Sequence, residues 1–480
     1  MTKGRVFAII IVVVVLALMV GLFVTGMTRG AAWVLDVEDV PRQDGSSGDD
    51  GVNVNIGGIK VDVEDDKVGV DVGGLDVDVG DGKVKVHLGG MNEEDRAAFA
   101  NWLDGLEDAF DNEDGGFSMF NFSFGWGNNW GSDFKNGTIV TNGSVEIGAD
   151  DVKGIKTNWI GGRMTIKTHS SSEILLEQTC KSGSIPEDRR LVYRIDGGKL
   201  VLREGAGRRV SSRTSTDLVI YLPENFAFVE NVELNGISTD IVAEKQTLTS
   251  HEDIEVSVVS GNVNLDGADS EGSIKLDSTS GDLTLNNCRA QRIVEADTTS
   301  GNVRFSEVRA GESMEMTTTS GDVYCEDSRV GQNVKTETTS GNVKLIEVEV
   351  GEKIEAESTS GDVYCENVTA RKFESSTVSG KATVKSSNIS EADSSSTSGD
   401  IAIESKKTMS ELRCGSISGS ISVTLPTHQS GFTAKYDTVS GDFRCDFATT
   451  SLGKHEVQYG DGSANIYFDT TSGDMRIIKG

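Results

Sequence analysis

Six acid or amide side chains recur at one fixed position in the C-terminal half of the chain and could bind a metal ion. Each follows a Ser-Gly dipeptide, at intervals of twenty residues: Asn262, Asp282, Asn302, Asp322, Asn342 and Asp362. Carboxylate and carbonyl oxygens are the ligands that Ca²⁺ prefers. Calcium-binding β-rolls, however, use a Gly-Gly-x-Gly-x-Asp nonapeptide, which this sequence lacks. A structural turn is therefore the favoured interpretation, with a row of calcium ligands as the alternative.

Other residues that could do chemistry do not form a recognisable constellation. The five histidines are isolated, at His87, His169, His251, His428 and His455. The Gly-x-Ser-x-Gly, His-Glu-x-x-His and P-loop motifs are absent. Some β-solenoids are polysaccharide-acting enzymes with acidic grooves under long loops, but only the looser repeats after Ser418 could carry such loops. The sequence thus predicts a protein that is not an enzyme, with no catalytic residue, cofactor or metal. A polysaccharide-acting enzyme is the weakest alternative.

The elements that carry the Ser-Gly repeat are predicted to be short strands. The third and fifth residues after each Ser are apolar and the fourth is polar, as in Val263, Asn264 and Leu265. A similar alternation precedes the Ser, as in Ile254, Glu255 and Val256. Period-two alternation is typical of a strand with one buried face. Each twenty-residue unit is therefore predicted to be one coil of a β-solenoid with two strands and two corners, in which the Gly supplies a positive φ.

Two further observations concern charge and cysteine. Alternation of Asn and Asp after the Ser-Gly would double the distance between carboxylates stacked about 4.8 Å apart. Of the six cysteines, four fall at positions predicted to be buried, so free thiols packed in the core are expected rather than disulfides: Cys325, Cys365, Cys414 and Cys445. The net charge is −31, which argues against nucleic acid as a partner.

The N-terminus is predicted to anchor the chain in a membrane. Residues 6–24 run without a charge behind Lys3 and Arg5. Such a run is close to the length of about 20 residues that spans a bilayer. We therefore expect a cytoplasmic stub at 1–5, a transmembrane signal-anchor helix at 6–27, and the remainder outside the cytoplasm. A cleaved signal peptide, cut near Gly30-Ala31-Ala32, is the alternative.

Three segments are expected between the membrane and the solenoid. Residues 28–56 read as an acidic Gly/Ser linker, and 57–90 as hairpins that alternate Val with Asp or Lys. Residues 91–136 combine a predicted amphipathic helix with a Gly-rich segment that contains many aromatic residues. The aromatic residues favour a cap for the open end of the solenoid over a surface that grips sugars or a membrane interface. Residues 36–114 alone hold 23 acidic and 6 basic side chains.

From about residue 137 onward the chain resembles the putative-adhesin family of bacterial and archaeal envelope proteins. The motifs that carry the resemblance are Asn142-Gly143-Ser144-Val145, the Leu222-Pro223 and Leu425-Pro426 strand ends, and the Thr-Ser-Gly-Asp repeats through Thr471-Ser472-Gly473-Asp474. The resemblance implies a β-strand repeat fold over residues 137–480, and the twenty-residue period places the strict repeats at 254–373. It implies a location in the cell envelope and leaves the ligand open.

The function expected from these observations is that of a membrane-anchored adhesive or scaffold element on the cell surface. Its expected partners are the bilayer, through residues 6–27, and surface glycans or an envelope protein. Five Asn-x-Ser/Thr sequons suit an exposed surface: Asn121, Asn136, Asn142, Asn367 and Asn388. An envelope-stress sensor that works with a membrane partner is the main alternative. In either case, binding is expected on the outward ladders of Tyr, Lys, Arg and Glu.

Overall fold

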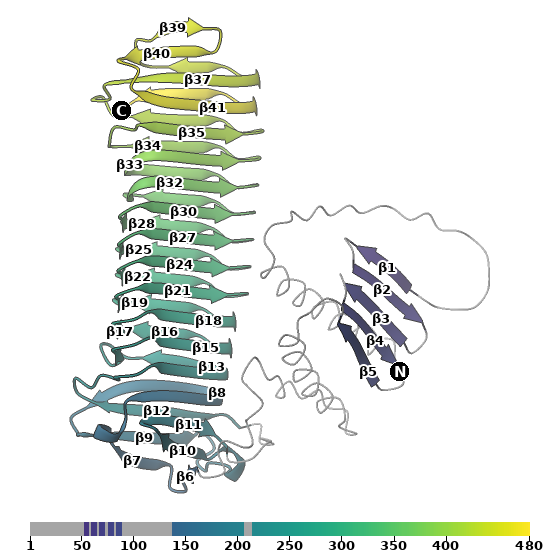
Figure 1. Ribbon diagram of the computed structural model, residues 1–480, viewed down its shortest axis with the longest axis vertical. Coiled ribbons are helices and arrows are strands. Elements are labelled where there is room, and N and C mark those ends of the chain that lie inside the picture. The colour runs from purple at the N-terminus through teal and green to yellow at the C-terminus, as the bar shows by residue number, and fades with distance from the viewer. Residues whose placement is uncertain are drawn as a thin grey trace. The chain divides into compact units, whose positions relative to one another are not determined.

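The computed structural model describes residues 137–205 and 214–480, together with the backbone of five strands between residues 52 and 88. The chain divides into two compact units, residues 1–130 and 131–480. Regular structure in the described residues is almost entirely β-strand, with two single-turn 3-10 helices, η2 (Ala149–Asp151) and η3 (Glu187–Arg189). Figure 1 shows both units. The chain is all-β in these regions, as predicted.

The first unit contains a five-stranded antiparallel meander. Its strands are β1 (Val52–Ile56), β2 (Ile59–Glu64), β3 (Lys67–Val72), β4 (Leu75–Gly80) and β5 (Lys83–Leu88). The pairs β2–β3 and β4–β5 are hairpins at the segments for which the sequence predicts them. The prediction of a linker over all of 28–56 is wrong at its end, because Val52–Ile56 pairs with β2. Its Val-Asn-Val-Asn-Ile alternation is itself a strand signal.

Several predictions lie outside the described residues. They are the cytoplasmic stub, the membrane helix at 6–27, the rest of the linker, and the helix and aromatic segment at 91–136. Among the residues that the structure does describe, no helix is both long and apolar enough to cross a membrane.

The second unit begins with a block of long strands that closes one end of the solenoid. Its strands are β6 (Thr138–Ile139), β7 (Ser144–Gly148), β8 (Gly154–His169), β9 (Glu173–Cys180), β10 (Leu191–Asp196), β11 (Lys199–Glu204), β12 (Thr216–Pro223) and β13 (Val232–Ala243). Many pairings here are antiparallel, such as β9–β12 and β10–β11. The parallel pairing of β8 with β13 then starts the stack. The solenoid therefore rests on a mixed sheet rather than on another coil.

Each strict coil contains three strands, and the prediction of two strands per coil is wrong. The first strands are β15 (Ile254–Ser260), β18 (Ile274–Ser280), β21 (Ile293–Thr298), β24 (Ser313–Thr318), β27 (Asn333–Thr338) and β30 (Lys353–Ser358). The second are β16 (Val263–Asp266), β19 (Leu283–Asn286), β22 (Val303–Ser306), β25 (Val323–Glu326), β28 (Val343–Ile346) and β31 (Val363–Glu366). The third are β17 (Asp269–Ser270), β20 (Arg289–Ala290), β23 (Arg309–Ala310), β26 (Arg329–Val330) and β29 (Glu349–Val350). The third strands have only two residues each, too few to show alternation in the sequence.

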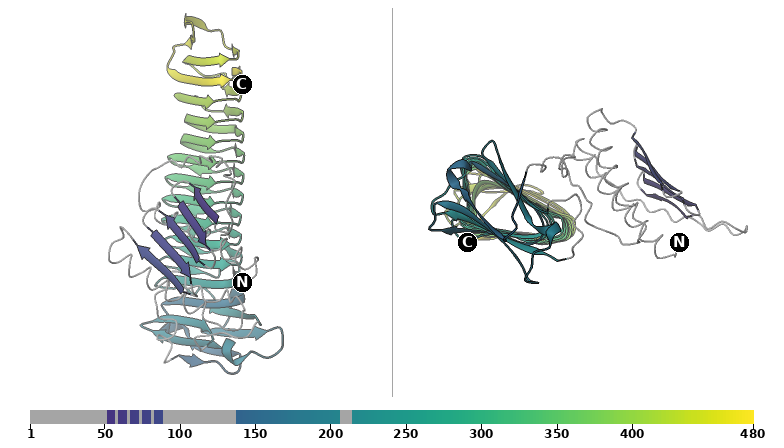
Figure 2. Two further views of the ribbon diagram at one scale, coloured as in Figure 1. Left: turned by 90° about the vertical axis from the view of Figure 1, so that its right-hand side faces the viewer. Right: turned by 90° about the horizontal axis from the view of Figure 1, so that it is seen from below.

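The coils stack in parallel with a constant register of twenty residues. Leu283 pairs with Val303, and Val303 pairs with Val323. Seen along its axis, the stack forms a flattened oval ring of strands (Figure 2). Inward side chains from all three strands of a coil fill the ring, and those of one coil are at most 2 % exposed: Ile274, Leu276, Leu283, Leu285, Cys288 and Ala290. One continuous apolar core therefore runs through the coils.

The Asn/Asp ladder is part of this stacking. The Asn302 backbone N–H donates to Asp282 Oδ1 at 2.8 Å, and the Asn302 side-chain amide donates to the same oxygen at 3.0 Å. Asp322 N–H in turn donates to Asn302 Oδ1 at 2.9 Å. Each side chain thus accepts a hydrogen bond from the next coil. Among the described residues, no group of acidic, His or Cys side chains is arranged to hold a metal ion.

The glycine of the Ser-Gly pair has a different role from the one predicted. Only Gly261 of the strict repeats has a positive φ there, at 152°. A Cβ on Gly321 would instead lie 1.9 Å from the carbonyl oxygen of Gly301 in the neighbouring coil. The positive φ occurs at the corner between the second and third strands, at non-glycine residues such as Glu307, at 55°, and Glu347, at 54°. The glycine is therefore required for close stacking of coils rather than for a left-handed turn.

The other end of the solenoid departs from sequential order. After β32 (Thr369–Thr377), β33 (Ala382–Ser396) and β34 (Ile401–Ser405), one coil contains β35 (Glu411–Ser416) and β36 (Ile421–Leu425). The strands that follow are β37 (Gly431–Ser440), β38 (Phe443–Cys445), β39 (Thr450–Gly453), β40 (Glu456–Gly460), β41 (Ala464–Ser472) and β42 (Met475–Lys479). The last two lie inside the stack, because β41 pairs with both β35 and β37, and β42 with both β36 and β38 (Figure 1). This insertion explains the spacing of 32 between Ser440 and Ser472.

All six cysteines are free thiols, as predicted. Cys325, Cys365 and Cys414 are buried in the core as predicted, whereas the prediction for Cys445 is wrong, because this residue is only partly buried against the core. Burial raises the pKa of Cys325 to about 12, so this side chain stays neutral and packs as a small apolar group.

Candidate functional site

The outward face of the second strands carries a ladder of cations and tyrosines. The Arg304 guanidinium lies 4.5 Å from the centre of the Tyr324 ring, and Lys344 lies between Tyr324 and Tyr364 at 5.5 and 5.9 Å. The Tyr364 hydroxyl donates to Glu366 at 2.8 Å. The sequence predicted binding on this ladder, but its members already interact with one another. Cation–π contacts of this kind stabilise an exposed surface by about 0.5–1 kcal/mol each.

The outward face of the first strands is rich in carboxylates. Lys335 forms ion pairs with Glu315 at 3.3 Å and with Glu337 at 3.2 Å. Asp297 lies on this face, directly across from Asp277 in the neighbouring coil. Burial, together with the carboxylates of Glu295 and Asp277, raises the pKa of Asp297 to about 6. In-register stacking therefore brings carboxylates of neighbouring coils together wherever the same position is acidic in both, as at Asp277 and Asp297.

We expect Asp297→Asn to stabilise the protein at neutral pH. A carboxyl whose pKa is raised on folding binds its proton more tightly in the native state, so the native state is penalised above that pKa. Since the group is partly exposed and screened by solvent, the expected gain at pH 8 is only about 1–2 kcal/mol. The gain should shrink as the pH falls through 6 and vanish near pH 4. Urea unfolding of both proteins across this pH range measures it.

The control for this variant is Glu187→Gln, which removes one exposed negative charge far from the carboxylate face. The Glu187 side chain is 86 % exposed. Its substitution should change the free energy of unfolding by less than about 0.5 kcal/mol at every pH. A gain for Asp297→Asn that stays constant from pH 8 to pH 4 would contradict the explanation from Asp297 titration.

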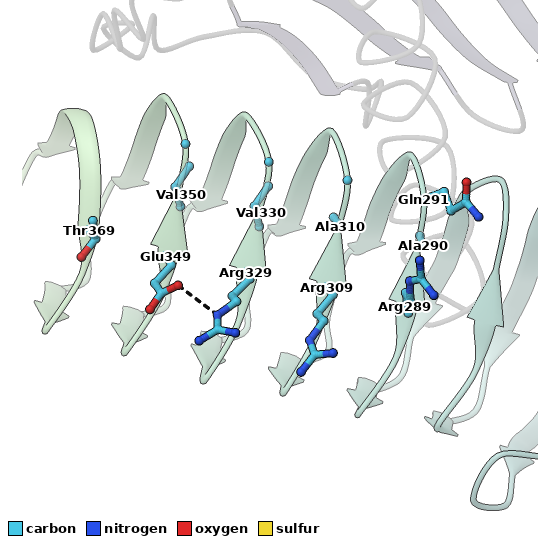
Figure 3. Close-up of a pocket in the computed structure, with 13 residues that line it drawn as sticks. Arg289, Ala290, Gln291, Arg309, Ala310, Arg329, Val330, Glu349, Val350 and Thr369 are labelled. Carbon is cyan, nitrogen blue, oxygen red and sulfur yellow. Dashed lines mark hydrogen bonds and ion pairs between the residues drawn. The ribbon is translucent and has the colours of Figure 1, made fainter.

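The third strands form the floor of a shallow groove along the solenoid, which we call the arginine groove. Figure 3 shows it from the side. Its volume is about 720 Å³, and its residues recur in register from coil to coil: Arg289, Ala290, Gln291, Arg309, Ala310, Gly311, Arg329, Val330, Gly331, Glu349, Val350, Gly351 and Thr369. Three exposed arginines stand on successive coils, which the backbone pairs in register. The groove therefore presents a row of arginines on strands that are spaced by about 4.8 Å.

The guanidinium groups of the row differ in their partners. Arg329 Nε pairs with Glu349 Oε2 at 2.9 Å (Figure 3). Within the described parts of the chain, neither Arg289 nor Arg309 forms an ion pair. A guanidinium presents its N–H groups in a fork that matches the oxygens of a carboxylate, sulfate or phosphate. Two of the three arginines are thus available to an anion.

The sequence predicts binding on outward ladders that include Arg, but this particular row is not among the predicted features. Its signal is the recurrence of Arg at 289, 309 and 329, nine residues after each Ser of the Ser-Gly pair. The row was missed because the two-residue third strand was not predicted. Without that strand, these arginines read as part of a corner.

A second cluster of charged groups was also missed, and it is buried. Glu204, in β11, is fully buried and pairs with Arg189 Nη1 at 3.0 Å. The Thr216 hydroxyl donates to it at 2.7 Å, and the backbone N–H groups of Ile160 and Gly161 donate at 2.9 and 3.1 Å. Burial raises the pKa of Glu204, against the opposing effect of Arg189 and these donors. With its carboxylate saturated by protein donors, the cluster is a structural element of the end block.

Comparison with known proteins supports a family assignment. The model of the Toastrack DUF4097 family matches residues 142–350 and 312–478. No curated protein matches the chain. One solved structure, of a putative cell adhesion protein from Clostridium sporogenes, is similar at 8 % identity and covers 72 % of this chain and 100 % of its own. Its TM-score is 0.16, so it carries no argument about this protein. Since the family model spans well over half of the 480 residues, the chain belongs to the Toastrack DUF4097 family.

Proposed function

We propose that this protein is a membrane-anchored scaffold that displays a rigid binding surface outside the cytoplasm. The observation that carries the proposal is the in-register stack of strict coils, which repeats each outward side-chain position along one direction. Such a stack suits an extended ligand better than a small substrate, because equivalent groups recur about every 4.8 Å. The proposed anchor is the predicted helix at residues 6–27.

The surface chemistry of the coils supports a binding role. Two of the three outward faces are largely occupied by their own ion pairs and cation–π contacts, such as Lys353 with Glu374 at 2.7 Å. The third face carries the arginine groove, which retains unpaired charge. We propose that this protein acts by binding rather than by catalysis.

The test is binding of the full chain to the surface of its source cells. The purified protein, labelled and held in detergent or nanodiscs, should sediment with intact cells or with isolated envelope material. Crosslinking in the native membrane tests the alternative. Recovery of one stoichiometric membrane partner, without any sedimentation with cells or envelope, would overturn the scaffold proposal in favour of a sensor.

A further inference from the structure

We propose that the arginine groove binds a linear anionic polysaccharide whose carboxylate or sulfate groups run parallel to the solenoid axis. This inference rests on the proposed surface function and names its ligand class. The groove concentrates cations on a chain of net charge −31. On the first strands of the same coils, by contrast, lysines such as Lys335 and Lys353 are already paired with glutamates. The third-strand face therefore differs from the first-strand face in that it carries arginines without ion-pair partners among the described residues.

The spacing of the row favours a polysaccharide over a peptide. The backbones that carry successive arginines are about 4.8 Å apart along the axis. Side chains on one face of an extended peptide recur at about 6.8 Å, so an acidic peptide would fall out of step with the row. A glycan with one acid group per sugar could place an anion beside each coil.

The groove floor also disfavours strand addition by a peptide. Its backbone groups are already used between coils, with the Arg309 N–H donating to Cys288 O at 2.9 Å and the Arg329 N–H donating to Val308 O at 3.0 Å. A peptide that binds as an added strand needs free backbone donors and acceptors. None of the described residues that line the groove is aromatic, so they offer no platform for the stacked bases of a single-stranded nucleic acid.

One side of the groove is formed by glycines whose backbone is in close contact with the backbone of the preceding coil. A Cβ on Gly311 would lie 2.0 Å from Gln291 O, and a Cβ on Gly331 would lie 1.9 Å from Gly311 O. These two positions accept only glycine and so place no side chain beside Arg309 and Arg329, whereas Gln291 occupies the equivalent position beside Arg289 (Figure 3). The floor between the arginines is apolar, from Ala310 and Val330 (Figure 3). A flat polymer can therefore lie along the coils of Arg309 and Arg329 without meeting a side chain at this position.

Glu349 defines one end of the row. It follows Arg329 on the next coil and pairs with it, so the third guanidinium is partly neutralised. Removing this carboxylate should release Arg329 and extend the site. The inference therefore predicts a variant that binds more tightly as well as variants that bind more weakly.

The experiment measures binding of fluorescent polygalacturonate oligomers and of dextran sulfate to the full chain in nanodiscs, by anisotropy at several salt concentrations. Wild type should bind both polymers and not uncharged dextran. Arg309→Gln should weaken binding about tenfold. Arg289→Gln combined with Arg309→Gln should abolish it, and Glu349→Gln should strengthen it about threefold. Each lost arginine should reduce the salt dependence of binding, since it removes one released counterion.

The matched control is Lys275→Gln, which removes the same charge from the first-strand face, where Lys275 lies 3.8 Å from Glu295. It should bind as wild type does. Equal affinity of wild type and the arginine variants would overturn the inference, as would tighter binding of poly-glutamate or oligothymidine than of the polysaccharides. If those arginine variants still sediment with cells, the groove assignment fails and the scaffold function stands. If wild type itself does not sediment with cells or envelope, the scaffold function fails as well.

Discussion

Gly321→Ala is expected to destabilise the solenoid by about 3 kcal/mol, near the upper end of the usual cost of overpacking. The added Cβ would lie 1.9 Å from Gly301 O and 2.5 Å from the Gly301 carbonyl carbon. Both atoms are backbone, so no side-chain rotation can relieve the clash. The Thr318 hydroxyl also bridges the two coils here, donating to Gly301 O at 2.8 Å and accepting from Gly321 N at 3.2 Å. Separating the coils would break this bridge.

The measurement is guanidinium unfolding of the full chain followed by circular dichroism. Gly415→Ala is the control, because a Cβ at Gly415 would meet nothing within 4 Å. It should leave the midpoint close to that of wild type. In a stack of coils held by nearest-neighbour interfaces, the Gly321 variant should also unfold in a broader transition, since the two halves are no longer firmly coupled. Equal midpoints for both variants would show that the coils are not in contact at the Ser-Gly corner.

Arg189→Ala is expected to cost about 3–5 kcal/mol, because it leaves a fully buried carboxylate without its cation. Glu204 would keep three hydrogen-bond donors, from Thr216, Ile160 and Gly161. Its pKa, already raised by burial, would rise further. A raised native-state pKa penalises folding above that pKa and releases the penalty as the pH falls through it. The deficit of the variant should therefore shrink between pH 8 and pH 5, as measured by urea unfolding.

A double variant separates the charge from the packing. Arg189→Met with Glu204→Gln removes both charges, and the amide oxygen can still accept from the backbone at Ile160 and Gly161. A pair replaced by neutral groups of similar volume usually costs little. This protein should lie within about 1.5 kcal/mol of wild type and show no extra pH dependence. A double variant as unstable as Arg189→Ala would mean that packing, rather than the buried charge, dominates at this cluster.

Strict periodicity is the reason so much of the fold could be predicted. Apolar residues at fixed positions, such as Val303 and Phe305 in a second strand, predict two of the strands in every coil and the core between them. The third strand could not be predicted, because two residues such as Arg309 and Ala310 cannot show a period. The role of the Ser-Gly glycines was misassigned for a related reason. Close contact between coils depends on a neighbour twenty residues away, whereas turn rules consider only local backbone angles.

The candidate site was harder to predict than the fold. The outward ladders are visible in the sequence, but which of them is already paired depends on side-chain geometry. Lys344 makes a cation–π contact with Tyr324, whereas Arg309 forms no ion pair in the described structure. The Glu204 cluster gives no sequence signal at all, since Arg189 and Glu204 meet only through the folding of the end block.

The strands β41 and β42 insert between strands that precede them in the sequence, and this has a consequence for the order of assembly. A solenoid built in sequence order can grow one coil at a time as the chain emerges, and can fray from its last coil. Here the layer made by β37 and β38 gains its parallel neighbours only when β41 and β42 have formed. This layer can therefore close only after β41 and β42 have been synthesised, and these two strands are then paired on both sides. A pulling force applied at Lys479 would therefore act first on a layer that lies inside the stack.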